Sequence, residues 1–319
     1  MGRGVIGNTT EFDSVVVGSN PAAPASEVVK MQKTKVICTS SCGLSKTEAD
    51  NLNIGFIPII VEFDNKEYAE GVDISSSDFF SLLSDKTVDK TNIPKTRMPD
   101  TSIITNLFEE VIEEGYQDIL VVTISSGLGG TYNKISIIAE DYKDRATIRV
   151  FDSRTTGFHE QYLVKTAKEL SEKNIGSADI FDALTKIREN CYLFGACADL
   201  SFLIYNGRLR GAAALLGKSL RVCPSLEMNE EGQITSFAKS LQSFRALFLA
   251  GQRVKSLVGS GDYLLWRLRT GEELLPQMLR VEQKLGFAPN TKEDIMSLCA
   301  GVHAGPQLGG WGVIKLENS

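Results

Sequence analysis

The stretch Val121-Val122-Thr123-Ile124-Ser125-Ser126-Gly127-Leu128-Gly129-Gly130-Thr131-Tyr132 changes character abruptly in its middle. An apolar run that begins near Ile119 ends in two serines and three glycines. Such a run is typical of a parallel strand covered on both faces. The residues from Tyr132 to Tyr142 then predict a helix, whose amino end favours anions, and glycines let the backbone approach a ligand. The stretch predicts either a loop that binds a carboxylate or phosphate, or simply a tight strand-to-helix turn.

The residues on either side continue an alternation of strands and helices. We expect strands at residues 35–39, 56–63 and 147–151, and the clearest helix at residues 102–114, where the apolar side chains share one face. Strand and helix in alternation imply right-handed crossovers and a parallel sheet. The carboxyl ends of the strands carry Thr39-Ser40-Ser41, Ser125-Ser126-Gly127 and Asp152-Ser153. Because ligands gather at this edge of a parallel sheet, these loops are candidates for a binding site.

The pattern becomes more mixed after Asp152-Ser153. Helices are expected at residues 160–173, 178–189, 209–219, 243–258, 272–285 and 291–296, and a hairpin joins strands at 222–228 and 233–238. The sequence therefore predicts an α/β protein with an N-terminal parallel-sheet domain at residues 33–156 and a second, mixed α/β domain at residues 157–319. Residues 1–32, rich in glycine, proline and other small residues, are expected to be a flexible leader, either native or introduced by cloning.

Composition excludes several classes of function. The 319 residues carry 34 Lys and Arg against 40 Asp and Glu, a net charge of -6, which argues against nucleic acid as the main partner. No stretch offers about 18 uninterrupted apolar residues, so no membrane span is expected. The six cysteines form no CxxC pair and the chain has only two histidines, so a structural zinc site is not expected. The cysteines are expected to be reduced thiols of a cytoplasmic protein.

Short motifs run through the chain in a fixed order: Ile37–Ser41, Glu67-Tyr68 with Gly71–Ser75, Pro94-Lys95-Thr96, Ile124–Tyr132, Asp152-Ser153, Asn206–Leu209 with Gly211–Gly217, and His303–Pro306. In this order and spacing the chain resembles the DegV family, fatty-acid-binding proteins that include the binding subunit of bacterial fatty acid kinase. The resemblance implies a two-domain DegV-like fold with the ligand cleft between the domains and a long-chain fatty acid buried there.

The resemblance also implies which residues hold the fatty acid carboxylate: Thr96, Ser126 and His303 occupy the positions of the family's ligands. Two hydroxyls and an imidazole can surround one carboxylate with charge-assisted hydrogen bonds. Ser125 and Gly127 are expected to support this site.

Two arginines accompany these positions. Arg97 stands where the family usually has serine, and we expect it either to turn into the pocket or to point to solvent. Arg208 is expected either to be a solvated surface residue or to contact the ligand's protein partner.

The predicted function is that of a carrier, not an enzyme. It would present the carboxylate to a separate kinase catalytic subunit, which binds ATP and forms the acyl phosphate. No cofactor, metal or nucleic acid is expected, and a transient membrane contact would serve lipid exchange in a bacterial cytoplasm. The alternative is an α/β-type small-molecule hydrolase or transferase acting on a carboxylated or phosphorylated substrate. It is less favoured because the sequence has neither a G-x-S-x-G elbow nor a phosphate-cradling lysine motif.

Overall fold

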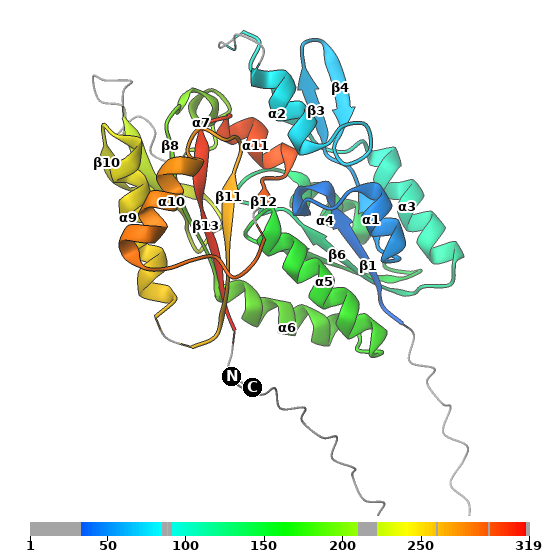
Figure 1. Ribbon diagram of the computed structural model, residues 1–319. Helices are drawn as coiled ribbons and strands as arrows, with labels where there is room; N and C mark the ends of the chain where they lie inside the picture. The colour runs from blue at the N-terminus through cyan, green and yellow to red at the C-terminus, as the bar shows by residue number, and fades with distance from the viewer. Residues whose placement is uncertain are drawn as a thin grey trace, which may run out of the picture. The chain divides into compact units, whose positions relative to one another are not determined.

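The computed structural model of the protein (Figure 1) describes residues 33–84, 88, 91–209, 222–259, 261–292 and 294–316. The leader predicted at residues 1–32 and the motif Gly211–Gly217 lie outside these ranges, as does nearly all of the helix predicted at 209–219. Within them, no helix is long and apolar enough to cross a membrane.

The first sheet is parallel throughout, with strands in the order β2-β1-β6-β7. These strands are β1 (Lys35–Thr39), β2 (Gly55–Ile57), β6 (Asp118–Thr123) and β7 (Thr147–Asp152). Side chains alternate between the two faces. Leu120 and Val122 pack against α5 (Phe158–Glu172) and α6 (Ser177–Glu189), whereas Ile119 and Val121 pack against α3 (Thr101–Glu113) and α4 (Thr131–Glu140). The prediction that the apolar run is a parallel strand covered on both faces is confirmed.

A small antiparallel sheet has the order β4-β3-β5 and contains β3 (Ile60–Phe63), β4 (Lys66–Ala69) and β5 (Lys95–Arg97). The single strand predicted at residues 56–63 is wrong, because the chain leaves the first sheet after Ile57 and enters this one at Ile60. Pro58 stands at the break, and proline has no N–H to continue a ladder. Three short helices complete this half of the chain: η1 (Ser40–Cys42), α1 (Lys46–Asn51) and α2 (Ser76–Ser84).

The third sheet has six strands in the order β10-β9-β8-β13-β11-β12. They are β8 (Cys191–Cys197), β9 (Cys223–Met228), β10 (Ile234–Ser240), β11 (Tyr263–Arg269), β12 (Asp294–Ile295) and β13 (Leu308–Lys315). The predicted hairpin is confirmed as β9 and β10, which pair antiparallel. The helix predicted at residues 291–296 is wrong: Asp294 and Ile295 form an edge strand that pairs in parallel with β11.

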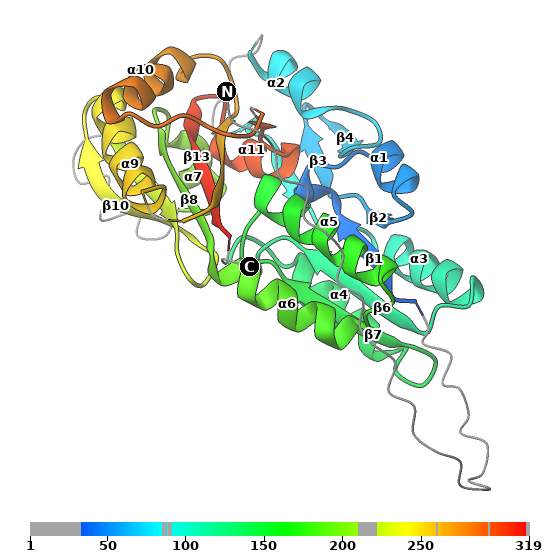
Figure 2. The ribbon, with the colours of Figure 1, turned by 60° about the horizontal axis from the view of Figure 1, so that its bottom comes forward.

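Helices α9 (Ser243–Leu257) and α10 (Leu275–Leu285) lie together along one face of the six-stranded sheet (Figure 2). Their apolar residues bury Trp311 and Val313 of β13. The short helices α7 (Ser201–Tyr205) and α11 (Leu298–Ala304) belong to the connections of this sheet. The fold is the mixed α/β arrangement that was predicted. The division at residues 156 and 157 stays a prediction, and both α5 and α6, which follow it, pack on the first sheet.

Candidate functional site

A pocket lies against the face of the six-stranded sheet that α9 and α10 leave uncovered. On this side most of the lining residues are apolar, namely Leu193, Leu226, Met228, Ile234, Leu268 and Leu308, and Glu227 of β9 also contributes. The opposite wall comes from β5, α11 and the loop between β6 and α4, including Ile124 and Leu128. The cavity volume of the pocket is about 100 Å³.

The two-residue period of the strands creates the apolar wall. Successive side chains of a strand point to opposite faces. Leu193 therefore lines the pocket, whereas its neighbour Phe194 packs with α9 and α10 on the far side. Leu226 and Met228 of β9 line the pocket in the same alternation. The wall is a consequence of sheet geometry and needs no special local motif.

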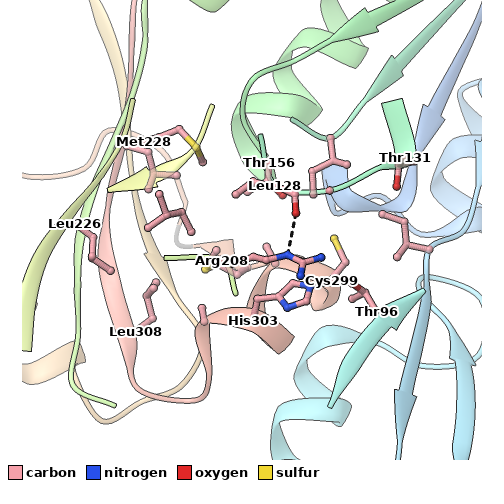
Figure 3. A pocket seen from close by; sticks show the side chains of 18 of the residues that line it. Thr96, Leu128, Thr131, Thr156, Arg208, Leu226, Met228, Cys299, His303 and Leu308 are labelled. Atoms are coloured by element: carbon pink, nitrogen blue, oxygen red, sulfur yellow. Dashed lines mark hydrogen bonds between the residues drawn. The ribbon is translucent and has the colours of Figure 1, made fainter. Parts of the chain in front are cut away.

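One end of the pocket holds the pair Thr96 and His303, which are 207 residues apart in sequence. Thr96 is the middle residue of β5, opposite Val61 of β3. His303 lies in the last turn of α11. Thr96 Oγ1 and His303 Nε2 are 2.8 Å apart, a hydrogen bond. Figure 3 shows both side chains at the pocket beside Arg208.

The imidazole of His303 is held in its neutral form. Burial, reinforced by the nearby positive charge of Arg208, lowers its pKa from 6.5 to about 3. Its Nδ1 is buried and has no hydrogen-bond partner among the residues that the structure describes. If Thr96 donates to Nε2, the proton of the neutral ring sits on Nδ1 and can be donated to an acceptor. The pair can therefore offer a donor to an oxygen of a bound ligand.

Arg208 brings a positive charge to the same end of the pocket. Its Nε donates to the carbonyl of Leu128 at 3.0 Å, as the dashed line in Figure 3 marks, and its Nη1 donates to the carbonyl of Asn206 at 2.5 Å. No carboxylate of the described residues pairs with this guanidinium. Partial burial lowers its pKa, but arginine stays charged at neutral pH. Neutral carbonyls position the cation without cancelling its charge, so an anion in the pocket would experience it.

The amino end of α4 also borders the pocket through Gly129, Gly130 and Thr131. Gly130 is the N-cap residue and provides no side-chain cap. Orphan N–H groups and the helix dipole give this end a partial positive charge. The predicted role of the glycines, close approach of the backbone to an anion at this helix end, stays a prediction.

The two serines of the opening stretch lie elsewhere. Ser126 donates from Oγ to Asp152 at 2.5 Å, and its N–H donates to the same carboxylate at 3.0 Å. Ser125 Oγ donates to the carbonyl of Gly232 in the β9–β10 turn at 2.7 Å. Neither serine is among the described residues that line the pocket. The strand ends do meet at one edge of the sheet, as expected, but here the serines bond to protein groups.

Gly127 lies under the same hairpin turn. A Cβ at this position would sit 2.6 Å from the carbonyl oxygen of Glu231 and 2.7 Å from that of Gly232. Glycine is therefore required for close packing of two backbone segments. Ser125 and Gly127 thus hold the β9–β10 turn of the six-stranded sheet against the loop that carries Leu128.

Arg97 lines the pocket through part of its side chain, but its guanidinium is bound elsewhere. It forms ion pairs with Glu62 at 3.3 Å, Glu67 at 2.9 Å and Asp100 at 2.6 Å. These side chains are largely solvated, so the cluster contributes little to stability. Of the two alternatives for Arg97, the geometry favours a surface role, because three carboxylates already occupy the cation.

The residues that the sequence missed are chiefly those of the apolar wall. Leu193, Leu268 and Leu308 come from strands that the sequence did not predict. Leu226 and Met228 could have been found, because their alternate positions in a predicted strand place them on one face. Cys299 of α11 also lines the pocket, and no local pattern marks it.

Ser126 and His303 bond to different partners. Ser126 bonds to Asp152 and His303 bonds to Thr96, so the described residues form no nucleophile–base pair between that serine and that histidine. No group of three or more metal-ligating side chains occurs among the described residues. The pocket combines two features: a polar end with hydrogen-bond donors and a cation, Arg208, that pairs with no carboxylate of the described residues, and an apolar wall.

Comparison with known proteins agrees with this architecture. The family model described as the DegV family matches residues 33–316. A DegV domain-containing protein of Clostridium acetobutylicum is 25% identical over 286 residues, covering 89% of this chain and 100% of the relative. The crystal structure of a fatty acid binding DegV family protein from Streptococcus agalactiae superimposes with a TM-score of 0.78 at 22% identity, covering 90% of this chain and 100% of that one. A stearic-acid-binding protein from Eubacterium ventriosum gives 0.72 at 24% identity, covering 88% and 98%.

Proposed function

Because this chain belongs to the DegV family, we propose that it binds one long-chain fatty acid in the pocket, with the carboxylate at the Thr96–His303 end and the acyl chain along the six-stranded sheet. One observation carries the proposal: a single pocket contains both a cation and an extended apolar wall. The cation is Arg208, which has no carboxylate partner among the described residues. Fatty acid binding is also the property for which the Streptococcus agalactiae and Eubacterium ventriosum structures are named.

The head group of a fatty acid matches the polar end of the pocket. A carboxylate only accepts hydrogen bonds. Neutral His303 can donate from Nδ1, Arg208 supplies the compensating charge, and the amino end of α4 adds partial positive charge. Hydrogen bonds to a charged group contribute about 1.5–3 kcal/mol each. The polar end therefore fixes the orientation of the ligand and selects an acid over a neutral lipid.

The acyl chain would supply most of the gross affinity. Burying one methylene contributes about 0.8 kcal/mol, so a chain of roughly 15 methylenes supplies a gross ~12 kcal/mol. Loss of ligand freedom offsets a large part of this. The apolar wall from Leu193 to Leu308 is the surface against which the chain would be buried. Affinity is thus expected to rise with chain length until the wall is covered.

Ser126 remains a predicted carboxylate ligand on the basis of the resemblance. Its hydroxyl is bound to Asp152, so direct binding would require that bond to be exchanged. Ser125 and Gly127 support the site through the hairpin turn, and Leu128 on the same loop fixes Arg208. The supporting role that was predicted for this loop is consistent with these contacts.

We further propose that the protein is a carrier in the bacterial cytoplasm. A partner kinase would transfer the γ-phosphoryl group of ATP to an oxygen of the bound carboxylate, giving the acyl phosphate and ADP. In this proposal Arg208 contacts both the carboxylate and the partner. Transient contact with a membrane would allow lipid exchange. This part of the proposal rests on the resemblance to the binding subunit of fatty acid kinase.

The test begins with protein purified from a bacterial host. Organic extraction and mass spectrometry should yield close to one long-chain fatty acid per chain, and delipidated protein should rebind it. Acyl phosphate should form only when ATP and a fatty acid kinase catalytic subunit are added. Lipid-free protein that does not bind added fatty acid would refute the carrier function. ATP-dependent turnover by the chain alone would favour the hydrolase or transferase.

A further inference from the structure

A buried glutamate connects the small sheet to the helix that carries His303. Glu70 follows β4 directly and is 4% exposed. Its Oε2 accepts a hydrogen bond from Ser40 Oγ at 2.7 Å, and its Oε1 accepts one from the N–H of Cys299 at 3.0 Å. No cation of the described residues neutralises it. A buried carboxyl group is costly unless its hydrogen bonds are made, so these two contacts account for its place in the fold.

The contact with Cys299 replaces a missing helix cap. Cys299 is the second residue of α11, and Ser297 at the N-cap makes no side-chain cap bond. The first N–H groups of a helix have no partner within it. Glu70 supplies an acceptor for one of them from 229 residues away in sequence. The start of α11 is therefore fixed by a residue outside the helix.

The other end of α11 is attached to the same sheet. His303 lies four residues after Cys299, about 6 Å along the helix axis, and bonds to Thr96 of β5. Thr96 pairs with Val61 of β3, and the N–H of Glu70 donates to the carbonyl of Ile59 just before β3 at 3.0 Å. One small sheet thus holds both ends of α11.

Packing between these two ends leaves little freedom to slide. Leu298 and Val302 of α11 are buried with Val61 and Phe80. A Cβ at Gly301 would lie 2.0 Å from the ring of Phe80. The helix therefore lies tightly on this sheet and its neighbour α2. A shift at Cys299 must be transmitted to His303, because one rigid turn separates them.

We propose that Glu70 is a positioning residue for the ligand site: it fixes the start of α11 and thereby holds the imidazole of His303 opposite Thr96. The proposal rests on the proposed function, in that His303 is the group that meets the ligand. The proposal depends on the length of the Glu70 side chain and not on its charge, because the oxygen that accepts from Cys299 is available whether or not the other oxygen carries a proton. Burial raises the pKa of this carboxyl group, which is compatible with either form.

Two substitutions separate the effect of side-chain length from the effect of charge. Glu70→Gln keeps the length of the side chain and one acceptor oxygen for Cys299, and its NH2 group would donate to Ser40 Oγ in place of the bond that Glu70 now accepts. Glu70→Asp keeps the charge but is shorter by about 1.5 Å, so a bond of 3.0 Å to Cys299 is lost. We expect Glu70→Asp to bind palmitate about tenfold more weakly, as for a lost hydrogen bond to a charged group. Glu70→Gln should stay close to wild type.

The decisive readout is nitrogen-15 NMR of the histidine rings in the full, ligand-free chain. The protein has two histidines, and His159 bonds to the carbonyl of Val313, so it serves as an internal reference. Glu70→Asp should shift the His303 signals alone and raise the pKa of His303 from about 3 toward its ordinary value. Phe108→Leu, in the core of the first sheet, is the matched control: it should lower Tm and leave both rings unchanged.

Three results would overturn the proposal. They are unchanged His303 signals in Glu70→Asp, an equal shift in Phe108→Leu, or a loss in Glu70→Gln as large as in Glu70→Asp. If Glu70→Asp does not fold, Ser40→Ala takes its place, and unchanged His303 signals in that variant would also overturn it. Failure of wild-type protein to bind fatty acid would refute the proposed function instead, and the ring signals would still report on positioning.

Discussion

Thr96→Val removes one hydroxyl from the polar end of the pocket and leaves the shape of the side chain almost unchanged. Thr96 Oγ1 lies 2.8 Å from His303 Nε2, so the substitution ends that bond and with it the control of the imidazole proton. Losing one hydrogen bond that serves a charged ligand costs about 1.5–3 kcal/mol, which is roughly a tenfold to 150-fold increase in Kd. The apolar wall is untouched, so the contribution of the acyl chain stays the same.

The assay compares palmitate with its methyl ester on delipidated wild-type and variant protein, by titration calorimetry or displacement of a fluorescent fatty acid. The acid should lose the full amount and the ester almost nothing, because the ester brings no charge to this end. Thr96→Ser keeps the hydroxyl and should restore most of the affinity. Equal losses for acid and ester would refute the reasoning, since they would show that Thr96 shapes the pocket without contacting the head group.

Further predictions concern the charge, the wall and the titration of the same site. Arg208→Met should weaken palmitate at least about tenfold and reduce the salt dependence of Kd; titrations at low and high salt with identical slopes would contradict this. Leu226→Trp should shorten the accepted chain, costing about 0.8 kcal/mol for each methylene displaced, so an equal loss for 12- and 18-carbon acids would count against the assigned wall. The pKa of His303 is lowered to about 3, so the unfolded chain gains its proton near pH 6.5 before the folded chain does. The contribution of neutral His303 to the free energy of unfolding is full above pH 6.5 and is lost as the pH falls, at up to about 1.4 kcal/mol per pH unit. Urea unfolding between pH 7 and pH 5 should therefore show a smaller dependence of the free energy of unfolding on pH for His303→Gln than for wild type. An unchanged pH dependence would show that His303 does not have this lowered pKa.

The first sheet was predictable because its strands are continuous apolar runs separated by helices with one apolar face. Apart from the hairpin of β9 and β10, the third sheet was not, and β13 shows why. Its sequence includes Gly309, Gly310 and Gly312, which hide the alternation expected of a strand. A Cβ at Gly310 would lie 2.2 Å from the carbonyl oxygen of Phe194, and one at Gly312 would lie 2.1 Å from the ring of Trp266. Close packing of neighbouring strands requires these glycines, and that requirement is invisible in the local pattern.

The candidate site could be predicted only through the family resemblance. Thr96 lies in strand β5 and His303 lies in helix α11, 207 residues away in sequence, so no periodicity links them. The resemblance named both, and the structure places them in contact. It also named Ser126, whose hydroxyl the structure pairs with Asp152. The strand pattern placed Ser126 and Asp152 at the same edge of the first sheet as candidates for a ligand site, and nothing in that pattern indicated that they bond to each other.

The most direct test of the account is carbon-13 NMR of palmitate labelled at its carboxyl carbon and bound to the delipidated full chain. The account predicts one bound signal per chain, in slow exchange, whose chemical shift does not titrate where free palmitate does, because Arg208 and His303 hold the carboxylate away from water. The same signal should move in Thr96→Val and stay unchanged in Phe108→Leu. No bound signal, or a bound carboxyl group that titrates as it does in water, would contradict the claim that this pocket holds the head group of a fatty acid.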